Sequence, residues 1–346
     1  MKFIHCADLH LESPLSGLVD GKRRRAELVT AFRNMLEYGY NSGVTAVVIA
    51  GDLFDGEYVS NSVILEVADC FLRYPSVQFY LLQGNHDGAK PIDKLRDLTI
   101  SNLHIFGSEW TYFYQENVCF CGAGKVDKGD YDSVVLDSGK YNCIVLHLDP
   151  SSDTYGYLDE KKLNALPVDY VALGHIHAYN SRKCGRGLEV NCGTLEARGF
   201  DETTETGFVL VDTTSVCSAK FIPSAIRKVH TFILDVTTCI STSNAIFLLK
   251  DLLVSTPKAD YVNIVLTGEL STGVDVSMIL SELSSAYFAV RIDNKTTLPK
   301  DIDRLRTELT LRGEFVRTVD KSNVTDTQKS MAIRYGIKAL SGEDVE

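Results

Sequence analysis

The sequence has no run of about 20 apolar residues, the length that a membrane-spanning helix needs. It does not open with a basic segment followed by a long apolar one, so we expect no membrane span and no secretory signal, and we predict a cytoplasmic protein. Nine cysteines are present, an odd number, without the paired C-x-x-C spacing that would support a zinc site. We interpret most of them as reduced thiols that fill small buried positions.

Three further absences narrow the function. The chain has no G-x-x-x-x-G-K-[ST] motif, so any use of ATP must come from a partner. It has no internal repeat with a period of 20–50 residues. Its formal net charge is −11, whereas a free-standing nucleic-acid-binding domain is usually basic. An enzyme that meets phosphates through metal ions is still allowed, because its ligand carboxylates contribute to that negative charge.

Basic side chains are nevertheless grouped locally, at residues 22–25, 182–186 and 227–228. Each group fits a phosphate contact, and each fits an ordinary solvated surface at least as well.

A chain of 346 residues with 45% apolar and 23% charged residues has room for two globular domains. Short apolar runs alternate with helical patterns over the first ~220 residues, which predicts an α/β architecture of two packed sheets with helices outside. The predicted helices are 26–40, 63–74 and 158–166, and further strands are predicted at 118–122 and 207–211.

The composition changes near Pro223. A small α+β unit without a ligand cluster follows, with predicted strands at 230–236, 261–267 and 288–293 and predicted helices at 243–253 and 276–286. Two more helices are predicted at 301–312 and 326–340. We therefore predict domains at 1–224 and 225–298 and a helical segment at 299–346.

Five apolar runs share one feature: each leads into histidine, aspartate or asparagine. The runs are 2–4, 46–50, 79–82, 144–146 and 170–173. The polar residues that follow them are Asp8, His10, Asp52, Asn85, His86, Asp87, His147, His175 and His177. Five of the eight histidines fall in these clusters, which a chance distribution does not explain. The other three, His5, His104 and His230, are predicted to be ordinary polar residues with satisfied hydrogen bonds.

Oxygen and imidazole donors without a required thiolate suit Mn²⁺, Fe²⁺ or Zn²⁺, with Mg²⁺ less suited to so many histidines. In an extended segment residues i and i+2 point to the same side, so Asp8 and His10 are predicted to reach one ion together. His175 and His177 have the same spacing, and Asp52 could bridge two ions. A pair of ions about 3.5–4 Å apart serves to activate water against a phosphate ester.

These motifs resemble the full motif set of the calcineurin-like metallophosphoesterases. Residues 3–15 and 193–202 further resemble the DNA repair exonuclease branch, which includes SbcD-type nuclease subunits and the bacterial YhaO-like group. The resemblance implies a four-layer α-β-β-α sandwich and a smaller C-terminal α+β capping domain that helps to bind DNA. It implies one ion held by Asp8, His10, Asp52 and His177, and a second held by Asp52, Asn85, His147 and His175. It also implies His86 as the catalytic histidine and Asp87 as its support.

Three functions follow, in order of preference. The first is a two-metal DNA phosphodiesterase, exonuclease or endonuclease, that acts in DNA repair. The resemblance then implies DNA and an SMC-like ATPase subunit as partners, with the terminal helices as the docking segment and a homodimer left open. Mn²⁺ is the preferred metal, and Fe²⁺, Zn²⁺ or Mg²⁺ are alternatives. The second function is hydrolysis of a small phosphodiester or phosphomonoester. The third is a scaffold without catalysis, against which the intact His86 and Asp87 argue.

Overall fold

The computed structural model describes residues 1–15, 20–127, 129–151, 154, 156–214, 218–271, 273–297 and 302–340. It contains two compact units, Met1–Val229 and His230–Glu346. The domain boundaries at 224/225 and 298/299 stay predictions, and residues 298–301 lie outside the described part of the chain.

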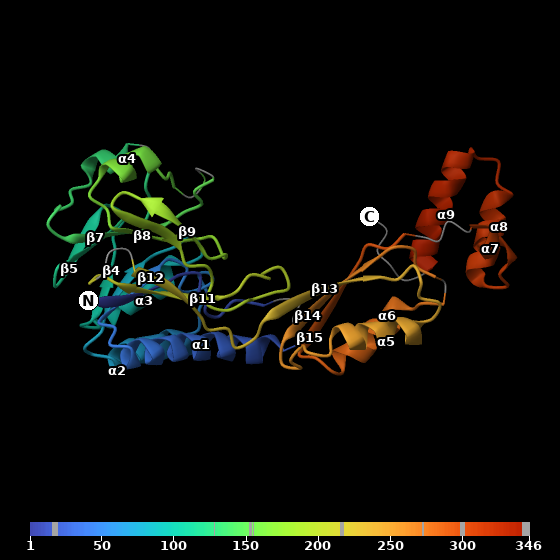
Figure 1. Cartoon of the computed structure of the whole chain (residues 1–346), viewed down its shortest axis with the longest axis horizontal. Coiled ribbons are helices and arrows are strands. Elements are labelled where there is room, and N and C mark those ends of the chain that lie inside the picture. The colour runs from blue at the N-terminus through green and yellow to red at the C-terminus, as the bar shows by residue number, and fades with distance from the viewer. Residues whose placement is uncertain are drawn as a thin grey trace. The chain divides into compact units, whose positions relative to one another are not determined.

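Two six-stranded sheets form the first unit (Figure 1). The first sheet has the order β12-β11-β1-β2-β3-β4 and comprises β1 (Lys2–Cys6), β2 (Ala46–Ala50), β3 (Gln78–Leu82), β4 (Leu103–Ile105), β11 (Gly207–Asp212) and β12 (Ser218–Pro223). The second has the order β5-β6-β7-β8-β10-β9 and comprises β5 (Thr111–Gln115), β6 (Val118–Gly122), β7 (Tyr141–His147), β8 (Tyr170–Gly174), β9 (Asn180–Cys184) and β10 (Gly187–Asn191).

The side chains of each inner strand alternate between two cores, as the two-residue period of a strand requires. In β1, Phe3 lies between the two sheets, and Ile4 faces the helices that cover the first sheet. Those helices are α1 (Gly21–Asn41), α2 (Asn61–Arg73) and α3 (Ala89–Asp97). Phe32 of α1 and Phe71 of α2 are fully buried there, and each such side chain contributes about 1.5–3 kcal/mol.

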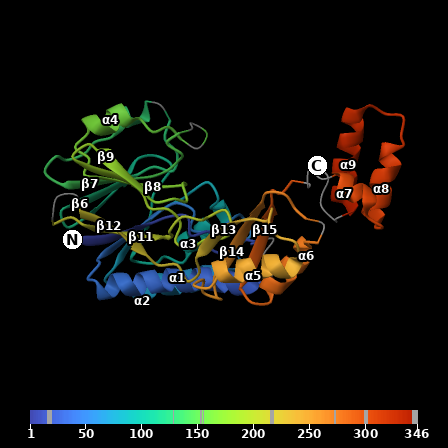
Figure 2. The same cartoon turned by 45° about the vertical axis from the view of Figure 1, so that its right-hand side comes forward.

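The opposite face of the second sheet is covered by α4 (Glu160–Ala165), through the buried Leu163, and by a 3₁₀ turn at Asp130–Ser133. Figures 1 and 2 both show α1 and α2 on one outer side of the paired sheets and α4 on the other. The predicted four-layer α/β sandwich is therefore confirmed. The eight cysteines within the described ranges are free and buried, as predicted.

Strand direction determines where a site can form. β1, β2 and β3 are parallel to one another, as are β7 and β8 in the second sheet. The carboxyl ends of parallel strands meet at one edge of a sheet, and loops at that edge commonly carry binding sites. All five candidate clusters follow these five strands.

The second unit contains a three-stranded sheet with the order β13-β14-β15. Its elements are β13 (Val229–Asp235), α5 (Thr242–Leu252), β14 (Tyr261–Thr267), α6 (Val276–Ser284) and β15 (Ala289–Asn294), in the predicted order. Leu249 of α5 and Ile279 of α6 pack on Val262 and Ile264 of the central strand.

Three helices follow: α7 (Ile302–Thr307), α8 (Leu311–Asp320) and α9 (Asp326–Leu340). The single helix predicted at 301–312 is wrong, because the chain leaves the helix after Thr307 and Thr310 begins a new one. The Thr310 hydroxyl accepts the Gly313 amide at 3.1 Å, which caps α8. Leu305, Val316 and Ile337 form part of the buried core of these helices. No helix in the described ranges combines the length and hydropathy required to cross a bilayer.

Candidate metal centre

The loops after β1 and β2 lie side by side at the carboxyl edge of the first sheet. The Asp8 amide donates to the Gly51 carbonyl at 3.1 Å, and the His10 amide donates to the Asp52 carbonyl at 3.0 Å. Asp8, His10 and Asp52 have φ values of 53°, 44° and 52°, a region that non-glycine residues seldom adopt. The segment is thus not extended, and this corrects the reason given for bringing Asp8 and His10 together: left-handed turns direct both side chains inward.

One candidate ligand group joins the two sheets. The Nε2 atoms of His10, after β1, and His177, after β8, lie 3.3 Å apart. Asp8 Oδ1 lies 3.9 Å from the first nitrogen and 3.8 Å from the second. These three residues could hold one metal ion. Together with Asp52, they are the four residues predicted to hold the first ion.

A second group lies around His147 at the end of β7. Its Nε2 is 2.9 Å from Asn85 Oδ1 and 3.2 Å from Asp52 Oδ2. His175 Nδ1 lies 3.0 Å from the same Asn85 oxygen. The four residues predicted for the second ion therefore form a continuous chain of contacts.

Asp52 connects the two groups. Its Oδ2 lies 3.2 Å from His147 Nε2 and 3.6 Å from His10 Nε2, so one carboxylate oxygen faces both. Its Oδ1 accepts the His86 amide at 2.8 Å, which holds the carboxylate in that orientation. The geometry suits a carboxylate shared by two ions.

Hydrogen bonds orient two of the imidazoles toward this space. His147 Nδ1 lies 2.8 Å from the Ala50 carbonyl oxygen, and His177 Nδ1 lies 2.7 Å from Glu202 Oε1. In a neutral ring with its proton on Nδ1, the lone pair is on Nε2, which in both residues points into the site. Metal-binding histidines commonly have such an acceptor on their second nitrogen. The donor set therefore fits divalent metal ions, and the fold together with its ligand groups supports the binding of two such ions.

Without an ion the buried charges depend on one another. Burial raises the pKa of Asp8 to about 6. Burial also raises the pKa of Asp52, but the hydrogen bond to His147 and its charge outweigh that effect and lower the pKa to about 2. Burial lowers the pKa of His147, while the Asp52 carboxylate raises it more, to about 9. In His10 burial dominates and lowers the pKa to about 2. A bound cation would replace the proton as the partner of these carboxylates.

His86 lies at the edge of the site with 51% of its side chain exposed. Its Nδ1 is 3.2 Å from Asp55 Oδ1, and its ring packs edge-on to His10 with centroids 5.0 Å apart. The other oxygen of Asp55 lies 3.6 Å from Arg198 Nη1. Asp55 is therefore the carboxylate that can orient His86.

That contact revises the prediction that Asp87 supports His86. The Asp87 carboxylate accepts the backbone amides of Phe54 at 2.7 Å, Gly84 at 2.9 Å and Leu53 at 3.3 Å. Asp87 is 5% exposed, and burial raises its pKa to about 7. It joins the loops that carry Asp52 and Asn85, so it holds the backbone rather than the His86 ring.

Two glycines make this packing sterically feasible. A Cβ atom at Gly84 would overlap Asp52 Oδ1, and a Cβ at Gly51 would overlap His147 Nδ1. Gly51 also has a φ of 93°, which favours glycine. The glycines of the Gly51-Asp52 and Gly84-Asn85 pairs thus let the ligands approach.

Sequence reasoning did not assign Asp55, Glu202 or Arg198 to the site. Asp55 lies three residues after Asp52. Glu202 and Arg198 lie in the segment 193–202, but no spacing in the sequence connects them with His177. The three histidines predicted to be ordinary polar residues do have protein partners: Tyr170 Oη for His5, Gln78 for His104 and Asp260 for His230.

The strand ends thus bring together a cluster of nitrogen and oxygen donors that could hold metal ions, with His86 at its rim. The model of the calcineurin-like phosphoesterase family matches residues 1–179, more than half of the sequence, and the chain belongs to that family.

Curated relatives are distant. The chain is 27% identical over 241 residues to the uncharacterized metallophosphoesterase YhaO of Bacillus subtilis, a match that covers 62% of the chain and 58% of the relative. It is 24% identical over 221 residues to a subunit of the SbcCD nuclease of Staphylococcus epidermidis, covering 51% and 57%. It is 26% identical over 202 residues to the DNA double-strand break repair protein Mre11 of Methanosarcina acetivorans, covering 54% and 32%. The matches thus span little more than half of these relatives at most.

Proposed function

We propose that the chain is a two-metal phosphodiesterase that hydrolyses DNA in DNA repair, as the nuclease subunit of a complex with an SMC-like ATPase. The observation that carries the metal part is Asp52, whose Oδ2 faces His10 at 3.6 Å and His147 at 3.2 Å. The names of two relatives, a nuclease subunit and a double-strand break repair protein, favour DNA as the substrate. We propose Asp8, His10, Asp52 and His177 as ligands of one ion and Asp52, Asn85, His147 and His175 as ligands of the other. Mn²⁺ is the proposed metal.

A bound pair of divalent ions would supply an activated water and positive charge beside the phosphate oxygens. The protein supplies the proton for the leaving group. With Asp55 Oδ1 at 3.2 Å from Nδ1, the His86 ring is oriented. Nε2 of His86 then donates a proton to the leaving oxygen, a form of general acid catalysis. The half-exposed ring leaves that nitrogen accessible to a substrate.

We also propose roles for the rest of the chain. Residues 225–298 are proposed as a capping domain that contacts DNA, since a small substrate needs no additional domain. Residues 299–346 are proposed to dock on the ATPase, and the segment includes the α7, α8 and α9 helices with their own small core. Residues 341–346 lie outside the described ranges. A measurement of the molecular mass in solution tests whether the chain forms a homodimer.

The test is hydrolysis with Mn²⁺ of labelled linear DNA, in parallel with bis-p-nitrophenyl phosphate. We expect the wild-type protein to cleave both substrates and the His86→Ala variant to lose both activities. Cleavage of the generic ester alone would favour a small phosphodiester as the substrate. Cleavage of neither, in protein shown to hold metal, would refute the proposed activity.

A further inference from the structure

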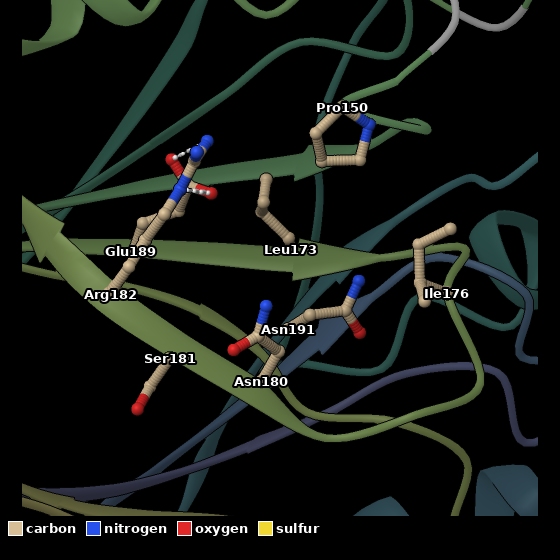
Figure 3. Close-up of a pocket in the computed structure, with 8 residues that line it drawn as sticks. All are labelled: Pro150, Leu173, Ile176, Asn180, Ser181, Arg182, Glu189 and Asn191. Carbon is tan, nitrogen blue, oxygen red and sulfur yellow. Dashed lines mark hydrogen bonds and ion pairs between the residues drawn. The ribbon is translucent and has the colours of Figure 1, made fainter.

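A cavity of about 160 Å³ lies beside the candidate metal centre. Its walls come from β8, β9 and β10 and from the loops that follow β7 and β8 (Figure 3). Two wall residues belong to the ligand loops: Ile176 stands between His175 and His177, and Pro150 follows His147 by three residues. A group bound in the cavity would therefore lie next to the loops that hold the candidate ligands.

The buried wall of the cavity presents one hydrogen-bond donor. Asn191, at the end of β10, is only 7% exposed, and its Oδ1 accepts the Gly193 amide at 3.1 Å. That bond determines the orientation of the amide, so the opposite atom is Nδ2. This nitrogen is buried and has no hydrogen-bond partner within the protein. In Figure 3 it points into the space near Leu173 and Ile176. A buried donor without an acceptor is unfavourable, and a ligand that offers an acceptor would remove that cost.

The remaining walls select a neutral group. Pro150, Leu173 and Ile176 are apolar. The charged end is internally paired, because Arg182 donates to Glu189 from Nε at 2.7 Å and from Nη2 at 3.0 Å. A paired guanidinium gives little attraction to a phosphate, and a paired carboxylate gives little to an ammonium group. The walls thus suit a flat, uncharged ring that carries a carbonyl oxygen or an unprotonated ring nitrogen.

We propose that this cavity binds a nucleobase. Its volume is roughly ten times the 10–15 Å³ that a single water requires, so a ring can enter. Every DNA base offers at least one acceptor to the Asn191 donor, so the cavity would tolerate different sequences. The base has two sources: a nucleotide of the DNA substrate close to the scissile phosphate, which rests on the proposed function, or a free nucleotide.

The first experiment blocks the cavity with Asn180→Phe, because Asn180 lines it from the exposed strand β9 and its side chain points toward Asn191 (Figure 3). Lys183→Phe is the matched control on the same strand, exposed and outside the cavity. Steady-state kinetics are measured on a short DNA oligonucleotide and on bis-p-nitrophenyl phosphate, which has no base. We expect Asn180→Phe to lower the ratio of kcat/KM for the oligonucleotide to that for the generic ester about ten-fold, since base contacts are lost. Lys183→Phe should leave the ratio unchanged.

Abasic substrates locate the bound base. An oligonucleotide with one abasic nucleotide at the correct position should reproduce the loss in the wild-type protein and cause no further loss in Asn180→Phe. Equal ratios in the wild type and Asn180→Phe, or equal losses in both phenylalanine variants, would overturn the proposal that the bound base belongs to the DNA substrate.

Binding without catalysis separates the cavity from the proposed function. The fluorescence of 2-aminopurine deoxyriboside is measured as metal-free protein is added. Saturable quenching that Asn180→Phe abolishes and Lys183→Phe retains supports a nucleobase site, even if no ester is hydrolysed. Asn191→Asp should also abolish it, because the variant keeps an acceptor for Gly193 and replaces the donor Nδ2 by an oxygen. Absence of quenching together with unchanged oligonucleotide kinetics would overturn the proposal.

Discussion

Two sets of strand ends in this chain carry similar residues and use them differently. At the edge of the large sheets, Asn85 Oδ1 lies 2.9 Å from His147 and 3.0 Å from His175, which follow other strands. In the small sheet, Asp235 and Asn294 also end strands. Their oxygens accept the amides of residues two positions further on, Thr237 at 2.9 Å and Thr296 at 3.1 Å.

The difference shows that convergence, and not residue type, makes a strand end a site. An acid or amide that bonds two residues further on forms an ordinary turn. Asp8, Asp52 and His175 instead have positive φ values, while Asp235 and Asn294 do not. Such strain persists only where the surrounding structure holds it, and it commonly marks functional sites.

The largest effect is expected from Asp52→Asn. The asparagine side chain keeps the shape of aspartate and can still accept the His86 backbone amide. It lacks the negative charge, and a nitrogen replaces the oxygen that faces both ligand groups. We expect both ions to be lost and hydrolysis to fall by more than the roughly 100-fold seen when residues around a metal site are changed. Metal content and bis-p-nitrophenyl phosphate hydrolysis measure this. Asp235→Asn is the control, since asparagine forms the same turn. Loss of a single ion in Asp52→Asn would contradict the shared carboxylate.

A smaller loss is expected from His86→Ala, about 10²–10⁴-fold in kcat with metal content unchanged, because a proton donor is removed.

Asp55→Asn should lower kcat less and alter the pH profile of kcat, since it changes the group that orients His86. Asp87→Asn distinguishes the two acids, because it should mainly lower the free energy of unfolding. If Asp87→Asn alters the pH profile and Asp55→Asn does not, the assignment of the orienting acid is wrong.

Glu202→Gln tests a residue that reaches the site through His177. Its oxygen lies 2.7 Å from His177 Nδ1, so the substitution should weaken metal affinity about 10–100-fold without removing a ligand. Calorimetric titration with Mn²⁺ measures the affinity. Glu205→Gln is the control, because Glu205 is exposed and its ion pair with Lys228 spans 3.8 Å. Equal affinities for Mn²⁺ in both variants would show that Glu202 does not contribute to metal binding.

The seven candidate ligands could be predicted because parallel strands bring their carboxyl ends to one edge, so order along the chain indicates proximity in space. The layered fold followed from the same alternation of apolar runs and helical patterns. Neither principle distinguishes Asp55 from Asp87, since both stand beside a ligand motif. An isolated bridge between Gly56 and Asp87 is formed only in the folded chain, where the Asp87 carboxylate accepts backbone amides.

Hydrogen bonds between residues far apart in the sequence could not be predicted for the same reason. Arg24 belongs to a run that predicts a solvated or phosphate-binding surface, yet it is fully buried. Its Nη2 donates to Glu196 at 2.5 Å and to the Ala197 carbonyl at 2.7 Å, from the far end of the same unit's sequence. Strand β9 is almost entirely exposed and carries no apolar alternation, so no pattern predicted it.

The smallest effect is expected within that basic run, and Arg24 determines how it must be tested. Reversing Arg24 would place a second negative charge against buried Glu196, and breaking a buried pair costs about 3–5 kcal/mol, so lost DNA binding would reflect unfolding. Lys22 and Arg23 are exposed. Glutamate at both positions suits the first turn of α1, which contains no acidic residue. If this surface contacts DNA phosphates, the double variant should weaken affinity several-fold and reduce the slope of log affinity against log salt by about 2, one for each lost contact. Fluorescence anisotropy at several salt concentrations measures both. An unchanged slope with an unchanged unfolding curve would show that Lys22 and Arg23 form an ordinary solvated surface.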